Sequence, residues 1–130
     1  MSGVRGLQLK GERYQDLEVW RVAYNLALRV YQVTTLFPTE ERFGLAQQLR
    51  RASVGVFTNL AEGHARGSRK EFVQFCTIAR GSQAEVHSLL LFSKELGFLK
   101  EEIWDELSDG YTRVGQMLNK LVTSLRKPAK

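Results

Sequence analysis

Four segments in which apolar residues recur every three or four positions constrain the fold of this chain more than any other feature. They span about residues 16–36, 41–63, 68–97 and 100–125, and the two prolines, Pro38 and Pro128, fall outside all of them. Because this spacing matches the 3.6 residues of a helical turn, each segment is predicted to be an amphipathic helix. Four helices with short connections predict an all-α fold, an antiparallel up-down-up-down four-helix bundle.

The ends of the second and third predicted helices are marked by residues with known terminal roles. Gly63 or Gly67 can adopt the left-handed conformation that ends a helix. Ser68 is followed three residues later by Glu71, which is the pattern of a capping box. The stretch around them lacks the Gly-x-x-x-x-Gly-Lys-Ser/Thr order of a phosphate-binding loop, so we interpret it as a helix connector. Gly97 is predicted to close the third helix.

The length and composition are those of one globular domain. A chain of 130 residues, 43% hydrophobic and 25% charged, is large enough to bury its own core. We expect a single domain over residues 1–130, with flexible tails at about 1–13 and 126–130. Cys76 is the only cysteine, which excludes an internal disulfide and favours a cytoplasmic setting. No apolar run approaches the ~20 residues of a membrane span, so no membrane contact is expected.

The first predicted helix has a wider apolar surface than one core needs. A surface helix of a globular protein normally buries a stripe of about 100°. Here two adjacent apolar stripes leave only a narrow polar strip, so the helix is predicted either to lie centrally or to contact a second subunit. The stripes are Leu17, Trp20, Tyr24, Ala27 and Tyr31, and Val19, Val22, Leu26, Val30 and Val33.

Positive charge is concentrated in the middle of the sequence. The segment from Arg42 to Arg80 holds seven basic residues and two acids, Glu62 and Glu71, a surplus equal to the net charge of +5. In the predicted bundle, Arg66, Arg69 and Lys70 and the chain termini would form a basic lower half opposite an acidic end, with Arg50, Arg51 and Arg80 roughly 20 Å above the turn. Such a half suits phosphate groups, although most charged helix faces are ordinary solvated surface. No aromatic residue is obviously interleaved with these basic residues, so stacking on unpaired bases is not expected.

The residue types needed for catalysis are mostly absent, and we expect no catalytic residue and no cofactor. Cys76 and His64 could form a nucleophile and base, but Cys76 falls inside a helix near its apolar stripe, and free cysteine is usually buried. Neither His64 nor His87 has a glutamate three residues before it, so the Glu-x-x-His pairs of metal-binding bundles are missing. The sequence therefore predicts a protein that is not an enzyme and has no metal site.

Three polar residues lie near the apolar stripes of the second and third helices. Asn59 and Glu62 share a helix face at a spacing of three residues, and Glu85 lies in the centre of the third helix. We expect them to form a buried hydrogen-bonded network with an arginine such as Arg51. A structural network that fixes helix register is a simpler interpretation than a catalytic one.

Several of these residues stand in motifs that resemble a known family. In order along the chain the motifs are DLEVW (16–20), QLRRASV (48–54), NLAEG (59–63), RGSRKEF (66–72), IARGS (78–82) and LGF (96–98). Together they closely resemble the bacterial four-helix-bundle proteins first noticed as reading frames inside intervening sequences of large-subunit ribosomal RNA genes. The resemblance covers roughly residues 14–125. One departure is Phe57, where relatives often carry proline.

The resemblance implies an assembly and a set of binding residues. Relatives assemble as ring-like homopentamers, and a related branch, the accessory variability determinant of diversity-generating retroelements, partners a reverse transcriptase. We therefore expect a homo-oligomer, RNA or DNA as a ligand with structured RNA favoured, and a nucleic-acid enzyme as another candidate partner. A protein-interaction scaffold or accessory subunit is the alternative. The residues carried over as nucleic-acid-binding candidates are Arg50, Arg51, Arg66, Arg69 and Lys70.

Overall fold

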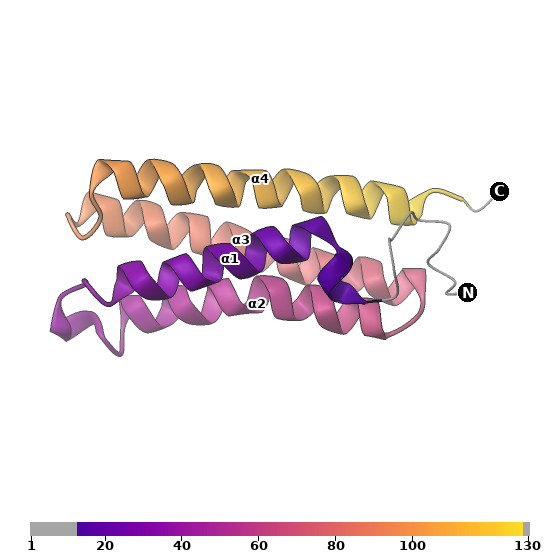
Figure 1. Ribbon diagram of the computed structural model, residues 1–130, viewed down its shortest axis with the longest axis horizontal. Helices are drawn as coiled ribbons and strands as arrows, with labels where there is room; N and C mark the ends of the chain where they lie inside the picture. Colours follow the sequence, from indigo (N-terminus) through magenta and orange to yellow (C-terminus); the bar gives the residue numbers. More distant parts are fainter. Residues whose placement is uncertain (1–12, 129–130) are drawn as a thin grey trace.

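The computed structural model describes residues 13–128, and all its regular elements are helical. Four long helices run alternately along the bundle axis, so that α1 begins and α4 ends at the same end (Figure 1). The predicted all-α antiparallel four-helix bundle is confirmed. The elements are η2 (Tyr14–Asp16), α1 (Glu18–Thr34), η3 (Thr39–Glu41), α2 (Leu45–Ala65), α3 (Arg69–Glu95) and α4 (Glu101–Arg126).

The connection between α2 and α3 has the predicted cap. Ser68 Oγ accepts a hydrogen bond of 3.1 Å from the Glu71 backbone N–H, which satisfies one of the unpaired donors at the start of α3. Gly67 and Gly97 have φ values of 81° and 83°, the left-handed conformation in which glycine avoids a Cβ clash. Gly63, the other candidate for this role, instead lies inside α2.

The start of α2 differs from the prediction. The sequence placed it at Glu41, but Thr39–Glu41 forms the separate 3-10 turn η3, and α2 begins at Leu45. Gly44 interrupts the two with a non-helical conformation of φ −110° and ψ −107°. Because of this break, Arg42 and Phe43 lie on a short connection rather than on a helix. Both residues line a groove at the start of α2.

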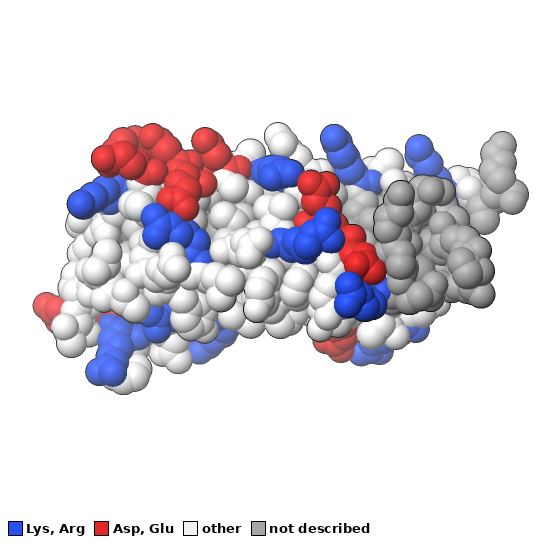
Figure 2. Space-filling model, viewed as in Figure 1, with Lys and Arg blue, Asp and Glu red and all other residues white. Residues whose placement is uncertain are grey.

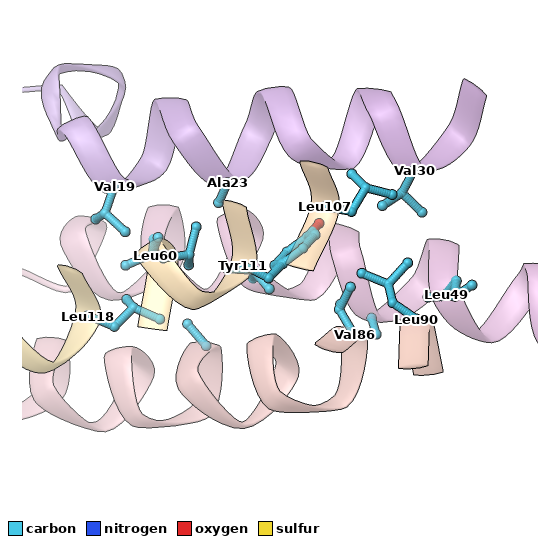
Figure 3. Close-up of a cluster of buried hydrophobic side chains, with 14 of the residues drawn as sticks. Val19, Ala23, Val30, Leu49, Leu60, Val86, Leu90, Leu107, Tyr111 and Leu118 are labelled. Carbon is cyan, nitrogen blue, oxygen red and sulfur yellow. The ribbon is translucent and has the colours of Figure 1, made fainter. Parts of the chain in front are cut away.

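Large apolar side chains from all four helices fill the interior (Figure 3). Removing them from water is the main stabilising contribution to such a fold, about 25 cal/mol per Å² of apolar surface. Among the fully buried side chains that α1, α2, α3 and α4 contribute are Val30, Leu49, Leu60, Val86, Leu90, Leu107, Tyr111 and Leu118.

Small residues let α2 approach α3 closely. A Cβ on Gly55 would lie 3.0 Å from Ser82 Oγ of α3, and one on Gly63 would lie 2.6 Å from Phe75 Cβ. Gly63 therefore has a packing role rather than a terminal one. It brings the two helix backbones together beside the turn that joins them.

The apolar surface of α1 is only partly covered. Its buried face includes Val19 and Val30, whereas Tyr24, Leu28 and Tyr31 are exposed. The wide apolar surface predicted from the sequence is therefore present on this chain, and its role in oligomerisation stays a prediction. The predicted tails, residues 1–13 and 126–130, lie outside the described residues except for Arg13 and residues 126–128. Across residues 13–128, no helix is both long enough and apolar enough to cross a membrane.

Candidate nucleic-acid interface

Acidic and basic side chains separate at the end of the bundle where α1 leads into α2 (Figure 2). Acidic side chains gather on one side, over the start of α4, and include Glu101, Glu102 and Glu106. Basic side chains lie on the opposite side, near the connection between α1 and α2. Basic residues also gather in two groups along α2, one near each of its ends.

The first arrangement is a groove beside the α1–α2 connection, which we call the basic groove. It has a volume of about 460 Å³. A second hollow of about 320 Å³ adjoins it and shares Arg42 and Arg50. No carboxylate lines either one, so the arginines dominate the local charge. The basic groove is lined by Tyr31, Arg42, Phe43, Gln47, Arg50, Arg51 and Val54.

Arg50 is held rigidly in this groove by α1. Its Nε donates a hydrogen bond of 2.8 Å to Thr34 Oγ1, and its Nη2 donates one of 3.2 Å to the Tyr31 carbonyl oxygen. Its guanidinium carbon lies 4.6 Å from the centroid of the Tyr31 ring. Neither partner is anionic, so Arg50 keeps its full positive charge in a fixed orientation.

Arg42, Phe43 and Arg51 complete the groove from the short connection and from α2. The Arg42 guanidinium carbon lies 5.5 Å from the centroid of the Phe43 ring, and Phe43 itself is 80% exposed. Arg51 is exposed, and within residues 13–128 it makes no ion pair with a carboxylate. The groove therefore presents three guanidinium groups and two exposed aromatic rings.

The second arrangement is the turn between α2 and α3, which we call the basic turn and which contains Arg66, Arg69 and Lys70. Arg66 forms ion pairs of 2.9 Å with Glu62 and 3.5 Å with Glu71, and the hydrogen bond to Glu62 raises its pKa. Arg69 Nη1 donates a hydrogen bond of 3.0 Å to the carbonyl oxygen of Lys127. Lys70 is exposed. Two of the three cations of the basic turn are thus already engaged.

The structure does not bring the five predicted binding residues onto one surface. At 1.5 Å per residue, Arg51 is about 9 Å from the start of α2 and about 21 Å from its end. The sequence also places Arg50 and Arg51 roughly 20 Å from the turn, so the predicted binding residues form two groups along α2 rather than one. Arg80, which was grouped with them, donates a hydrogen bond of 2.7 Å to Asn119 Oδ1.

The expectation that no aromatic residue is interleaved with the basic residues is wrong, because the rings of Phe43 and Tyr31 lie beside Arg42 and Arg50. Tyr31 comes from α1 and reaches the groove only because α1 packs against α2. Phe43 follows Arg42 directly in the sequence, and this adjacency is the signal that sequence reasoning missed. The aromatic content of the site thus depends partly on a tertiary contact.

The predicted buried network of Asn59, Glu62 and Glu85 does not form within this chain. Asn59 is half-buried, and its Nδ2 donates a hydrogen bond of 2.7 Å to the Gly55 carbonyl oxygen in its own helix. Glu62 is exposed and pairs with Arg66. Glu85 is exposed because it lies beside Val86, which defines the buried face of α3 at that level. One residue along a helix rotates a side chain by about 100°, enough to move it out of the core.

Of the residues considered for catalysis, Cys76 is buried and the two histidines are half-buried. Cys76 is fully buried, and burial raises the pKa of its thiol to about 12, which keeps it protonated at neutral pH. The His64 ring packs edge-on against Phe72 at 5.9 Å, and His87 Nε2 lies 3.1 Å from Ser108 Oγ. No group of three or more His, Cys, Asp or Glu residues in the described part of the chain could hold a metal ion.

Comparison with known proteins identifies a family and a solved structure that resemble this chain. Residues 15–120 match the family described as 23S rRNA-intervening sequence protein. No curated protein matches the chain. A solved structure of a protein of unknown function from the S23 ribosomal protein family of Bacteroides thetaiotaomicron is similar, with a TM-score of 0.74 and 18% sequence identity. The alignment covers 80% of this chain and 97% of that one. At this identity, the likeness shows the fold alone.

Proposed function

The chain belongs to the 23S rRNA-intervening sequence protein family, and from that premise we propose that it is a non-enzymatic, oligomeric protein that binds structured RNA through a basic surface. The observation that carries the proposal is the basic groove, in which Arg42, Arg50 and Arg51 converge without a lining carboxylate. The family is named for a sequence that intervenes in 23S rRNA. Ribosomal RNA is therefore the first ligand to test.

The chemistry of the groove suits phosphate groups. A guanidinium group offers parallel N–H donors whose geometry matches two phosphate oxygens, and it stays charged at any physiological pH. Each phosphate neutralised by a protein cation releases condensed counterions, which makes such binding favourable and dependent on salt. Because Arg50 is already fixed by Thr34 and Tyr31, binding would not have to order it.

Oligomerisation forms the second part of the proposal. Apolar side chains are exposed on two helices, and subunit contact would remove them from water. A homopentamer, as the family resemblance implies, would repeat the basic groove around a ring and increase the apparent affinity by multivalency. Light scattering at micromolar concentration should then return a multiple of the chain mass, and a monomer mass would reject this part. The exposed side chains outside the basic groove are Tyr24 and Leu28 on α1 and Ile78, Leu91 and Phe92 on α3.

The first experiment measures fluorescence anisotropy of nuclease-treated protein with a 23S rRNA fragment across a salt series. We expect affinity to fall steeply with salt, and an Arg42→Gln/Arg51→Gln variant to bind at least tenfold more weakly with a flatter salt slope. The matched control is Arg69→Gln/Lys70→Gln, which removes the same charge from the basic turn. Equal losses in the two variants would show that charge alone, and not the groove, governs binding.

A second candidate function is a protein-interaction scaffold, including an accessory subunit of a nucleic-acid enzyme such as a reverse transcriptase. The exposed apolar side chains of α3, among them Ile78 and Phe92, favour it. A partner retained after nuclease digestion and released by Ile78→Asp would support this function. We infer a cytoplasmic location in either case, because a single unpaired cysteine suits a reducing compartment.

A further inference from the structure

We propose that the basic groove takes an unpaired nucleotide of an RNA, with its base stacked on Phe43 and its phosphate held by Arg42 and Arg51. The inference rests on the proposed RNA-binding function and specifies which part of an RNA enters this site. It predicts that loops, bulges or single strands, rather than paired helices, are the segments bound in the groove.

Phe43 is the residue that points to a base. It is 80% exposed and stands between η3 and α2, so it contributes almost nothing to the core. The exposed phenyl ring offers an apolar face next to the cations that would hold phosphates. Every nucleobase has a π-face that can stack on such a ring. The neighbouring Arg42, 5.5 Å from the ring centroid, places a positive charge beside the ring, where the phosphate of a stacked nucleotide would lie.

The Tyr31–Arg50 pair forms a second flat surface in the groove. The guanidinium lies 4.6 Å from the ring centroid and is fixed by hydrogen bonds to Thr34 Oγ1 and the Tyr31 carbonyl oxygen. A guanidinium plane supported in this way can stack on a base and carries a charge that attracts the adjoining phosphate. Rigid aromatic and guanidinium surfaces lose little conformational entropy when a ligand binds.

The remaining lining and the dimensions of the groove fit one nucleotide. Gln47 has an amide that both donates and accepts hydrogen bonds, as the edge of a base does. The volume of about 460 Å³ lies in the range of sites for small ligands and is far too small for a duplex. A phosphate could then reach Arg51 at the exposed side of the groove.

Other ligands would use only part of this surface. In a duplex the bases are stacked on one another, so a paired helix would satisfy the arginines but leave the Phe43 ring uncovered. An acidic peptide would likewise pair with Arg42 and Arg51, with nothing to stack on the ring. Of these three ligands, only the unpaired nucleotide offers the groove both a phosphate and a free aromatic face.

The test compares two RNAs of equal phosphate number, a single strand carrying 2-aminopurine and a blunt duplex of two annealed strands. We expect the full-length protein to bind the single strand more tightly and to change its 2-aminopurine fluorescence. Phe43→Leu should weaken single-strand binding about tenfold and change duplex binding less than twofold. Leu96→Ala is the control, because Leu96 is also exposed, at 47%, but lies outside the groove lining and outside the surfaces proposed for oligomerisation and partner binding.

The outcomes separate this inference from the proposed function. If Phe43→Leu binds both RNAs like the unaltered protein while Arg42→Gln/Arg51→Gln weakens both, the groove binds phosphates and the stacking inference is wrong. If neither RNA binds at low salt, both proposals fail. If an oligoglutamate peptide binds with an affinity that depends on Phe43, the groove is a protein-binding site and the nucleotide inference is overturned. Circular dichroism should show an unchanged helical content for each variant.

Discussion

The basic groove and the basic turn lie at opposite ends of the same helix, and each contains three cationic residues. In the basic turn, Arg66 pairs with Glu62 and Glu71, and Arg69 donates to a backbone carbonyl. In the basic groove, Arg50 contacts only neutral partners, and no carboxylate lines the site. The number of basic residues therefore does not decide where an anion binds. The decisive property is whether neighbouring groups already neutralise the cations.

The two regions also differ in how they are packed. Beside the basic turn, α2 and α3 are in close contact at Gly63, and the cap of Ser68 closes the connection tightly. At the other end, η3 and Gly44 leave a short irregular connection that exposes Phe43. We therefore interpret the basic turn as mainly a structural junction, and we propose the basic groove as the binding surface. Four substitutions test this difference between the two regions, in order of decreasing expected effect.

The largest effect is expected from Gly63→Ala, which tests the structural role of the junction. The added Cβ would lie 2.6 Å from Phe75 Cβ, so α2 and α3 must move apart. We expect a loss of about 1–2 kcal/mol in the free energy of unfolding, after allowing for the better helix propensity of alanine. Urea denaturation measures it.

The control for that change is Gly81→Ala in the middle of α3, where an added Cβ meets nothing within 4 Å. It should instead stabilise the protein by about 0.5–1 kcal/mol through helix propensity alone. A neutral or stabilising Gly63→Ala would contradict the tight packing inferred beside the basic turn.

The second effect is expected from Gln47→Glu, which gives the basic groove the carboxylate that the basic turn already has. A negative charge among Arg42, Arg50 and Arg51 should weaken RNA binding about tenfold at 0.1 M salt. The control is Gln48→Glu, which makes the same change of net charge one residue away, outside the groove lining. Anisotropy titrations that gave equal losses for the two variants would count against a localised site.

A smaller effect is expected from Glu62→Gln, which partly frees Arg66. Without its 2.9 Å partner, Arg66 keeps only the longer contact of 3.5 Å with Glu71. We expect RNA affinity at low salt to rise about twofold and thermal stability to fall slightly, because the pair is exposed to solvent. No change in affinity would mean that pairing does not limit binding at the basic turn.

The smallest effect concerns Arg29 and Glu106, a third arginine–carboxylate pair, which joins α1 to α4 by hydrogen bonds of 2.8 and 3.0 Å. The hydrogen bond from Arg29 lowers the pKa of Glu106. A lowered carboxyl pKa contributes stability above the unfolded value of about 4.3, and that stability is lost as pH falls through the folded pKa. The contribution should be only about 0.3–0.5 kcal/mol, because both side chains are partly exposed.

Denaturation at pH 6 and pH 3 measures that contribution. Glu106→Gln should lose less stability than the unaltered protein over this interval, since it has no carboxylate to titrate. Glu102→Gln is the control, because Glu102 is exposed on the same helix without an ion pair in the described part of the chain. Identical pH dependence for Glu106→Gln and the unaltered protein would show that the pair adds nothing.

Much of the fold could be predicted because its signals are local. The apolar repeat of each segment, the capping box of Ser68 and Glu71, and the left-handed glycines at 67 and 97 each depend on residues only a few positions apart. The start of α2 could not be predicted as reliably, because η3 continues the helical pattern up to the break at Gly44. The exposure of Glu85 was missed because one residue of helical phase separates it from the buried Val86.

The four helices, their order and the composition of their apolar faces follow from residue spacing along the chain, so the sequence alone predicts them. Which arginines pair with carboxylates and which stay open to an anionic ligand depends on the tertiary structure. Arg50 meets Tyr31 and Thr34 across the α1–α2 contact, whereas Arg66 meets carboxylates of α2 and α3 at the turn. Charge availability depends on distances of 3–5 Å between side chains, and packing between elements sets those distances.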